Sequence, residues 1–150
     1  MVILTKNEIE INSNINDVFE FTSDMGNFGL WFPDVISIRS KDKLPSATIG
    51  KEYLETAKKP FGGTVKILIQ VKEVIKNKIY VTEGNFFPLF PRMTLNFKKR
   101  SEDKTYLYFK MESRSKSFFF KMFLLPIVKL ILKKRAKAGL INLKKILESK

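Results

Sequence analysis

The last third of the chain most constrains its fold, because it predicts one long helix whose first half is apolar on nearly every side. Residues 118–132 form an apolar run interrupted only by Lys121, Pro126 and Lys129, and a lysine-rich stretch follows. We therefore predict a helix over residues 117–148 that the rest of the molecule must cover, with Pro126 marking a kink or its true start. One stripe at helical spacing should pack on a sheet: Leu125, Val128, Leu132, Ala136, Gly139, Leu140, Leu143, Ile146 and Leu147.

The first 33 residues predict a strand and two short helices. Residues 2–12 alternate between polar and apolar side chains, and the apolar side carries Ile3, Ile9 and Ile11. Capping residues then begin a two-turn helix over residues 14–21. A second short helix over residues 24–32 should end at Pro33.

The middle of the chain predicts six more strands joined by short turns. They are expected at residues 35–40, 50–57, 64–75, 78–83, 92–99 and 105–112. Connections this short are typical of antiparallel hairpins. In three of the strands the apolar parity is clear: Val65, Ile67, Ile69 and Val71; Met93, Leu95 and Phe97; Leu107, Phe109 and Met111. Their polar alternates predict a sheet with one dry face.

Length and composition exclude several classes of protein. A chain of 150 residues suits one domain, which we place at residues 1–150. The absence of Cys and His excludes disulfides, thiol nucleophiles, serine triads and most zinc sites, so we expect no metal and no cofactor. No secretion signal is apparent, and the apolar run of 15 residues is shorter than the roughly 20 needed to span a bilayer. We expect a cytoplasmic protein.

The positive charge gathers in the predicted carboxy-terminal helix. The whole chain carries a net charge of +13, and residues 116–150 contain ten Lys or Arg but only one acidic residue, Glu148. Such a helix could attract anionic lipid, nucleic acid or an acidic partner, or simply present a solvated face. No nucleic-acid-binding motif accompanies the charge, so nucleic acid is not the expected partner.

Four short motifs occur in order along nearly the whole chain. They are residues 9–11 leading into 17–21; Asp24 with Asn27 and residues 31–35; Gly50 opening a strand; and residues 140–148. Together they resemble the START-like superfamily, also called Bet v 1-like or SRPBCC, and within it the polyketide cyclase/dehydrase and lipid transport group. The resemblance implies the α+β helix-grip fold, a curved antiparallel sheet wrapped around a long carboxy-terminal helix, with two short helices after the first strand.

The resemblance also implies a cavity between sheet and helix, with gating loops at its mouth. The corresponding connections here are residues 58–63 and 85–91, and the second contains an unusual apolar cluster. We expect this cavity to bind a small hydrophobic ligand such as a lipid, an isoprenoid or a polyketide-like molecule. The expected ligand-binding residues are Trp31, Tyr53, Phe87, Phe90, Met93, Leu95, Phe97, Leu107, Phe109 and Leu132. The same side chains could instead plug the cavity and make it a core.

Two alternative functions remain open at this stage. Because the group includes cyclases and dehydratases, a buried carboxylate could support catalysis, although Glu55 and Glu83 are expected to face solvent. The other alternative is a peripheral membrane or protein-interaction module. It would use residues 118–132 and the basic cluster Lys133, Lys134, Arg135 and Lys137 to contact an anionic membrane surface. The sequence leaves the oligomeric state open.

Overall fold

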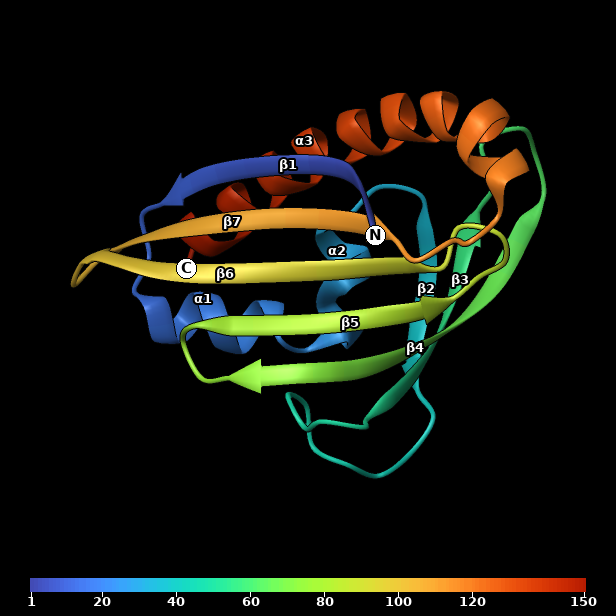
Figure 1. Cartoon of the computed structure of the whole chain (residues 1–150). Helices are drawn as coiled ribbons and strands as arrows, with labels where there is room; N and C mark the ends of the chain where they lie inside the picture. Colours follow the sequence, from blue (N-terminus) through green and yellow to red (C-terminus); the bar gives the residue numbers. More distant parts are fainter.

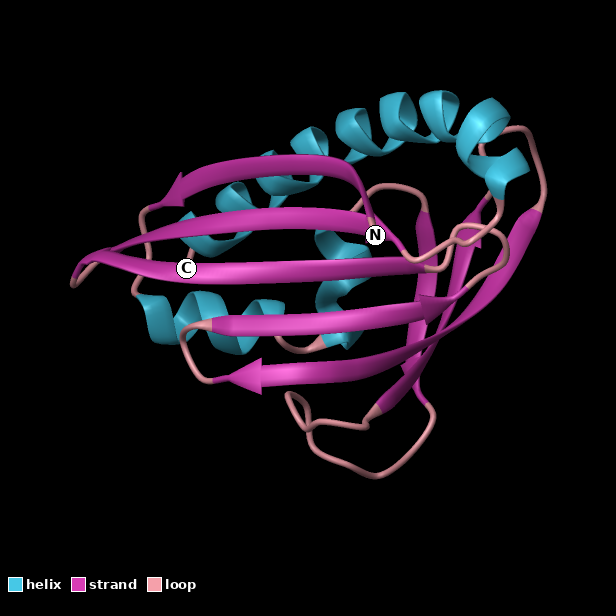
Figure 2. Cartoon of the chain, in the orientation of Figure 1, coloured by secondary structure: helices cyan, strands magenta, loops and turns pink.

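The computed structural model describes residues 1–150 and has a curved seven-stranded antiparallel sheet in the order β1-β7-β6-β5-β4-β3-β2. A long carboxy-terminal helix runs behind this sheet, and two of its strands, β2 and β3, lie at a steep angle to β5–β7 (Figures 1 and 2). The helix-grip prediction is therefore confirmed. The strands are β1 (Val2–Ile11), β2 (Val35–Ser40), β3 (Glu52–Lys58), β4 (Thr64–Ile75), β5 (Ile79–Asn85), β6 (Pro91–Ser101) and β7 (Lys104–Ser113).

The amino-terminal strand departs from the predicted alternation. Ile9 and Ile11 turn inward as expected, but Ile3 is exposed and Leu4 is buried instead. The cause is an irregularity in the pairing of β1 with β7 between Ile3 and Thr5. One extra residue in a strand reverses which side chains face the core beyond it.

The segment after β1 forms three short helical elements rather than two. Helix α1 (Ile15–Thr22) begins as predicted, because the Asn14 side chain accepts a hydrogen bond from the Asp17 N–H. The second predicted helix is divided into a 3₁₀ turn, η1 (Met25–Asn27), and α2 (Phe28–Trp31). Asp24 caps this 3₁₀ turn by accepting a bond from the Gly26 N–H at 2.9 Å.

The carboxy-terminal helix begins with a π-helical turn, η2 (Phe120–Leu124), and continues as α3 (Leu125–Glu148). Pro126 lies in the first turn of α3, where its missing N–H costs no internal hydrogen bond. The predicted stripe is buried or half-buried throughout. At Gly139 the helix passes so close to α2 that a Cβ atom would lie 3.2 Å from Cδ2 of Phe32. No helix of the structure is long and apolar enough to cross a membrane.

Aromatic packing fills the part of the interior that lies under α1 and α2. The ring of Phe19 meets Phe97 edge-on with centroids 5.2 Å apart, and Phe32 stacks on Phe109 at 5.9 Å. Trp31 is 1% exposed and also contacts Phe109 edge-on. This end of the sheet is therefore solid.

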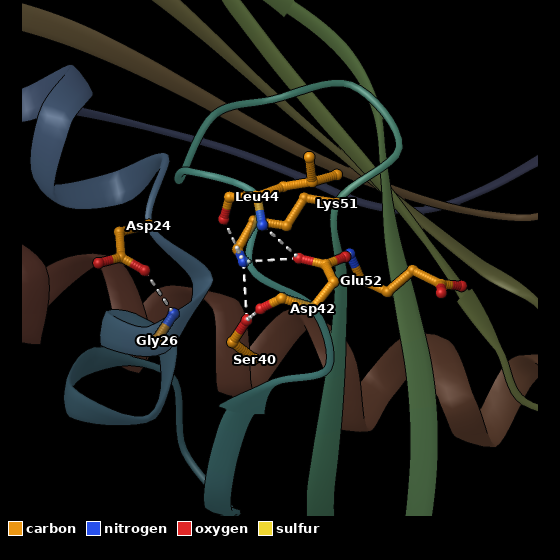
Figure 3. A network of polar contacts seen from close by, with 7 residues as sticks. All are labelled: Asp24, Gly26, Ser40, Asp42, Leu44, Lys51 and Glu52. Atoms are coloured by element: carbon orange, nitrogen blue, oxygen red, sulfur yellow. Dashed lines mark hydrogen bonds and ion pairs between the residues drawn. The ribbon is translucent and has the colours of Figure 1, made fainter.

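A buried lysine fixes the connection between β2 and β3 (Figure 3). Lys51 Nζ donates hydrogen bonds to Ser40 Oγ at 2.7 Å, Asp42 Oδ1 at 3.0 Å and the Leu44 carbonyl at 2.6 Å. The other Asp42 oxygen accepts a bond from the Glu52 N–H, and these contacts hold the pKa of the Asp42 carboxyl below its usual value. A loop of polar residues is thereby anchored to the sheet.

Candidate ligand-binding cavity

A cavity of about 310 Å³ lies between the other end of the sheet and the start of the carboxy-terminal helix. Figure 1 shows the β3–β4 connection, the β5–β6 connection and the first turns of the helix gathered at this end of the molecule. Both connections border the cavity, as the sequence predicted for the two mouth loops. Its apolar walls come from the strands, the short helices and the carboxy-terminal helix: Ala57, Val65, Ile67 and Ile69; Met93 and Met111; Met25, Phe28 and Phe32; Phe120, Leu124, Ile127, Val128, Ile131 and Leu132.

The expected ligand-binding residues are divided between the cavity and the packed core. Met93 and Leu132 border the cavity, whereas five others lie outside its wall. These five fill the solid end of the interior beneath α1 and α2: Trp31, Leu95, Phe97, Leu107 and Phe109.

The pairing of β6 with β7 explains this division. Met93 lies opposite Met111, and the next inward pairs are Leu95 with Phe109 and Phe97 with Leu107. Successive inward residues advance by about 6.6 Å along a strand. Only the first pair reaches the cavity, because the other two lie under the short helices. The alternation of polar and apolar residues predicts which face of the sheet a side chain occupies. It does not predict where along a strand the packed core ends and the cavity begins.

The apolar loop before β6 uses different residues from those expected. Phe87 is 75% exposed, and Phe90 packs on it with ring centroids 6.0 Å apart, so neither borders the cavity. Phe86 and Leu89 border it instead, together with the prolines of the loop. Their spacing of three residues puts both on one side of a tight turn, a signal that strand alternation does not capture.

Tyr53, one of the expected ligand-binding residues, lies deeper than expected, and Tyr80 is buried as well. Tyr53 and Tyr80 are buried outside the cavity wall, and neither hydroxyl has a hydrogen-bond partner. Burial raises the pKa of both hydroxyls, and the pKa of Tyr80 rises further because Tyr53 is close. Neither is in a position to orient a ligand in the cavity.

The prediction that Glu55 faces solvent is wrong. Tyr53, Glu55 and Ala57 form the buried face of β3, and Glu55 is only 8% exposed on the cavity wall. Its carboxyl forms no hydrogen bond or ion pair with the protein. Burial raises the pKa of Glu55 to about 7, although the positive charge of Arg135 opposes part of this rise. The alternation of polar and apolar residues predicts an outward position for any charged residue of a strand, so it does not predict the inward position of Glu55.

Other charged groups near the cavity already have partners or lie at its rim. Arg135 borders the cavity, but its Nε is 2.9 Å from Asp34 Oδ2. The wall includes Lys58 and Lys59 of the mouth loop, both exposed. Glu83, also expected to face solvent, is half-buried and bound by Arg92 at 2.6 Å. Among the carboxylates, only Glu55 faces the cavity.

Solved structures with this architecture align with nearly the whole chain. A START superfamily protein from Mycobacterium smegmatis aligns over 97% of both chains, with a TM-score of 0.78 and 12% identity. Ara h 8.0201 aligns over 97% of both chains, with a TM-score of 0.70 and 14% identity. The di-domain ARO/CYC StfQ from the steffimycin biosynthetic pathway has a TM-score of 0.72 and 9% identity, covering 99% of this chain and 51% of StfQ.

These likenesses show that the chain has the START-like fold, also called SRPBCC or Bet v 1-like, that its motifs predicted. At such low identity they concern the fold alone. No family model matches the sequence, and no curated protein matches it either.

Proposed function

We propose that this chain, acting as one START-like domain, binds and carries a small hydrophobic ligand in the cavity beside β3 and β4. The supporting observation is the cavity itself, which has a volume of about 310 Å³ and is bordered by 18 hydrophobic residues. That volume is at the lower end of the roughly 300–1,000 Å³ typical of small-molecule sites. Transfer of apolar surface from water into such walls contributes about 25 cal/mol per Å² to affinity.

A cavity-filling substitution tests this proposal. Val128 borders the cavity from α3, so Val128→Trp should fill much of the space that a ligand would use. Ile141→Trp on the exposed side of the same helix is the matched control. Native mass spectrometry followed by organic extraction should find an apolar molecule in the wild type and the control, but not in Val128→Trp. Equal ligand content in all three proteins, or none in the wild type, would count against the cavity as a carrier site.

A second candidate function is contact with an anionic membrane surface, supported by an exposed apolar face beside the cavity mouth. We name this face the mouth patch: Phe118, Phe119, Met122, Phe123, Leu124, Ile127 and Leu130. Phe118, Phe119 and Leu130 are 71%, 70% and 73% exposed, respectively. Leu124 and Ile127 belong both to this patch and to the cavity wall. A contiguous apolar surface of this kind is typical of an interaction site.

The charges around the mouth patch favour anionic lipid as the partner. Lys116, Lys121 and Lys129 lie among its apolar residues, and Lys133 and Lys134 follow on the next turn. All five are exposed, and no acidic residue occurs between positions 116 and 147. Each lysine near an anionic surface contributes about 1 kcal/mol of attraction. A bilayer docked here would lie directly over the cavity opening, so a lipid-like ligand would enter without crossing water.

Vesicle flotation tests the membrane contact. Wild-type protein should float with phosphatidylglycerol-containing vesicles and much less with pure phosphatidylcholine. Lys133→Glu with Lys134→Glu should weaken partitioning by at least about thirtyfold. Lys76→Glu with Lys78→Glu, which makes the same charge change in the exposed β4–β5 turn, is the control. Equal loss of flotation in both variants would indicate that the net charge of the protein, rather than this surface, causes the binding. Concentration-dependent dimers without flotation would indicate that the mouth patch binds a second copy of the chain.

A further inference from the structure

Glu55 is the one carboxylate on the cavity wall, and it has no protein partner. Its side chain is more than nine-tenths buried on the inward face of β3, opposite Ile67 of β4. Buried carboxylates in folded proteins are normally held by hydrogen bonds or ion pairs. The carboxyl of Glu55 has no such partner in the protein, so it is free to form a hydrogen bond with a ligand in the cavity.

The protein itself cannot supply that partner without rearrangement. Arg135 is the cation whose charge acts on Glu55, but its guanidinium is bound to Asp34 on the α2–β2 connection. Thr82 also borders the cavity, yet it forms no hydrogen bond with Glu55. A ligand that donates a hydrogen bond to Glu55 would satisfy the carboxylate, whereas a pure hydrocarbon would cover it and deprive it of water.

The surrounding charges determine which kind of donor fits. The other charged side chains on the cavity wall are Lys58, Lys59 and Arg135, all positive. A cationic ligand would have to pass the two lysines at the mouth and then lie beside the guanidinium, so these groups disfavour an amine. A neutral hydroxyl meets no such repulsion.

The position of Glu55 along β3 sets the expected shape of the ligand. It lies three residues from the end of the strand at Lys58, which is about 10 Å below the mouth loop. The walls on the mouth side of Glu55 are largely apolar, from Ala57 and Val65 to Ile127. Apolar walls also continue on the inner side of Glu55, where Ile69 lies one inward position deeper than Ile67, so the arrangement suits a largely apolar molecule with one hydroxyl at the depth of Glu55.

We propose that the cavity selects an apolar molecule carrying a hydroxyl, with the O–H donating to the Glu55 carboxylate. This inference rests on the proposed ligand-binding function and names the chemical class of the ligand. It makes Glu55 the residue that determines specificity, whereas the apolar walls supply most of the affinity.

A matched pair of probes separates this inference from the proposal on which it rests. Fluorescence titration at pH 8 would measure the binding of 2-naphthol and of 2-methylnaphthalene. The two probes differ only by a hydroxyl in place of a methyl group. The wild type should prefer 2-naphthol by about tenfold, the gain expected for a hydrogen bond to a charged group. Glu55→Leu should abolish the preference while retaining 2-methylnaphthalene binding, and Glu55→Gln should retain part of it because the amide oxygen still accepts.

The control variant is Glu52→Leu, which removes a carboxylate from the opposite face of the same strand and should leave the preference for 2-naphthol unchanged. Equal affinity of the wild type for both probes, or a preference that survives in Glu55→Leu, overturns the role of Glu55 and leaves the cavity as a binding site. Binding of neither probe overturns the cavity as a ligand site as well. Circular dichroism of each variant shows whether a lost preference reflects lost folding.

Discussion

The buried carboxyl of Glu55 should make the unliganded protein less stable as the pH rises through the range in which this group ionises. The pKa of Glu55 is raised from 4.5 to about 7 in the folded chain. As the pH rises, the unfolded chain loses the Glu55 proton first, near its unperturbed pKa, while the folded chain still holds it. Stability from this group is therefore fully present below pH 4.5 and is lost progressively until about pH 7.

The magnitude follows from the size of the shift. A rise of the Glu55 pKa from 4.5 to about 7 corresponds to about 3 kcal/mol, most of which falls between pH 5 and pH 8. The pKa values of Asp42, Glu102 and Glu148 are lowered instead. Their contributions are present above the ordinary carboxyl pKa values and are lost as the pH falls through and below those values, so they change little between pH 5 and pH 8.

Urea denaturation at pH 5 and pH 8 measures the effect directly. The wild type should lose about 2–3 kcal/mol of unfolding free energy relative to Glu55→Gln over this interval, because the amide does not ionise. Glu52→Gln on the outer face of β3 is the control and should follow the wild type. Parallel pH dependence of the wild type and Glu55→Gln would refute the reasoning, since it would mean that the Glu55 carboxyl is solvated or paired in solution.

Two further substitutions test contacts that hold the fold together away from the cavity. Lys51→Met should lower the free energy of unfolding by about 1–3 kcal/mol in urea denaturation, because Asp42 and the Leu44 carbonyl lose their buried hydrogen-bond donor. The same change at the exposed Lys43 should be nearly neutral. Equal effects of the two substitutions would contradict the role of the Lys51 network. Gly139→Val should lower the free energy of unfolding by about 1–3 kcal/mol and lower the melting temperature, because the valine side chain would clash with Phe32 where α3 crosses α2. An unchanged melting temperature would show that the two helices separate readily at this point.

The sequence predicted the fold well because each element carries a local signal. The period of the apolar stripe predicted the face of α3 that is buried, and Asn14 predicted the start of α1. The irregularity in β1 was missed, because an extra residue between Ile3 and Thr5 leaves no mark in the composition of the strand.

The candidate site was harder to predict, because it depends on where packing stops. The side chains of Leu95 and Met93 face the same side of β6, yet only Met93 borders the cavity. The difference comes from the short helices that cover one end of the sheet, a tertiary feature that no strand pattern contains. Glu55 was missed for a related reason, since a charged side chain on the dry face contradicts the pattern that was used to find that face.

The contrast between the two ends of the sheet has a consequence for how such a protein can diverge. On β6 and β7, the inward residues under α1 and α2 pack only in the core, whereas Met93 and Met111 belong to the core and also border the cavity. Because only Met93 and Met111 among these inward residues border the cavity, apolar substitutions of similar volume there should reshape the cavity while the packing under the short helices stays intact. A single scaffold could in this way change the shape of its cavity one side chain at a time.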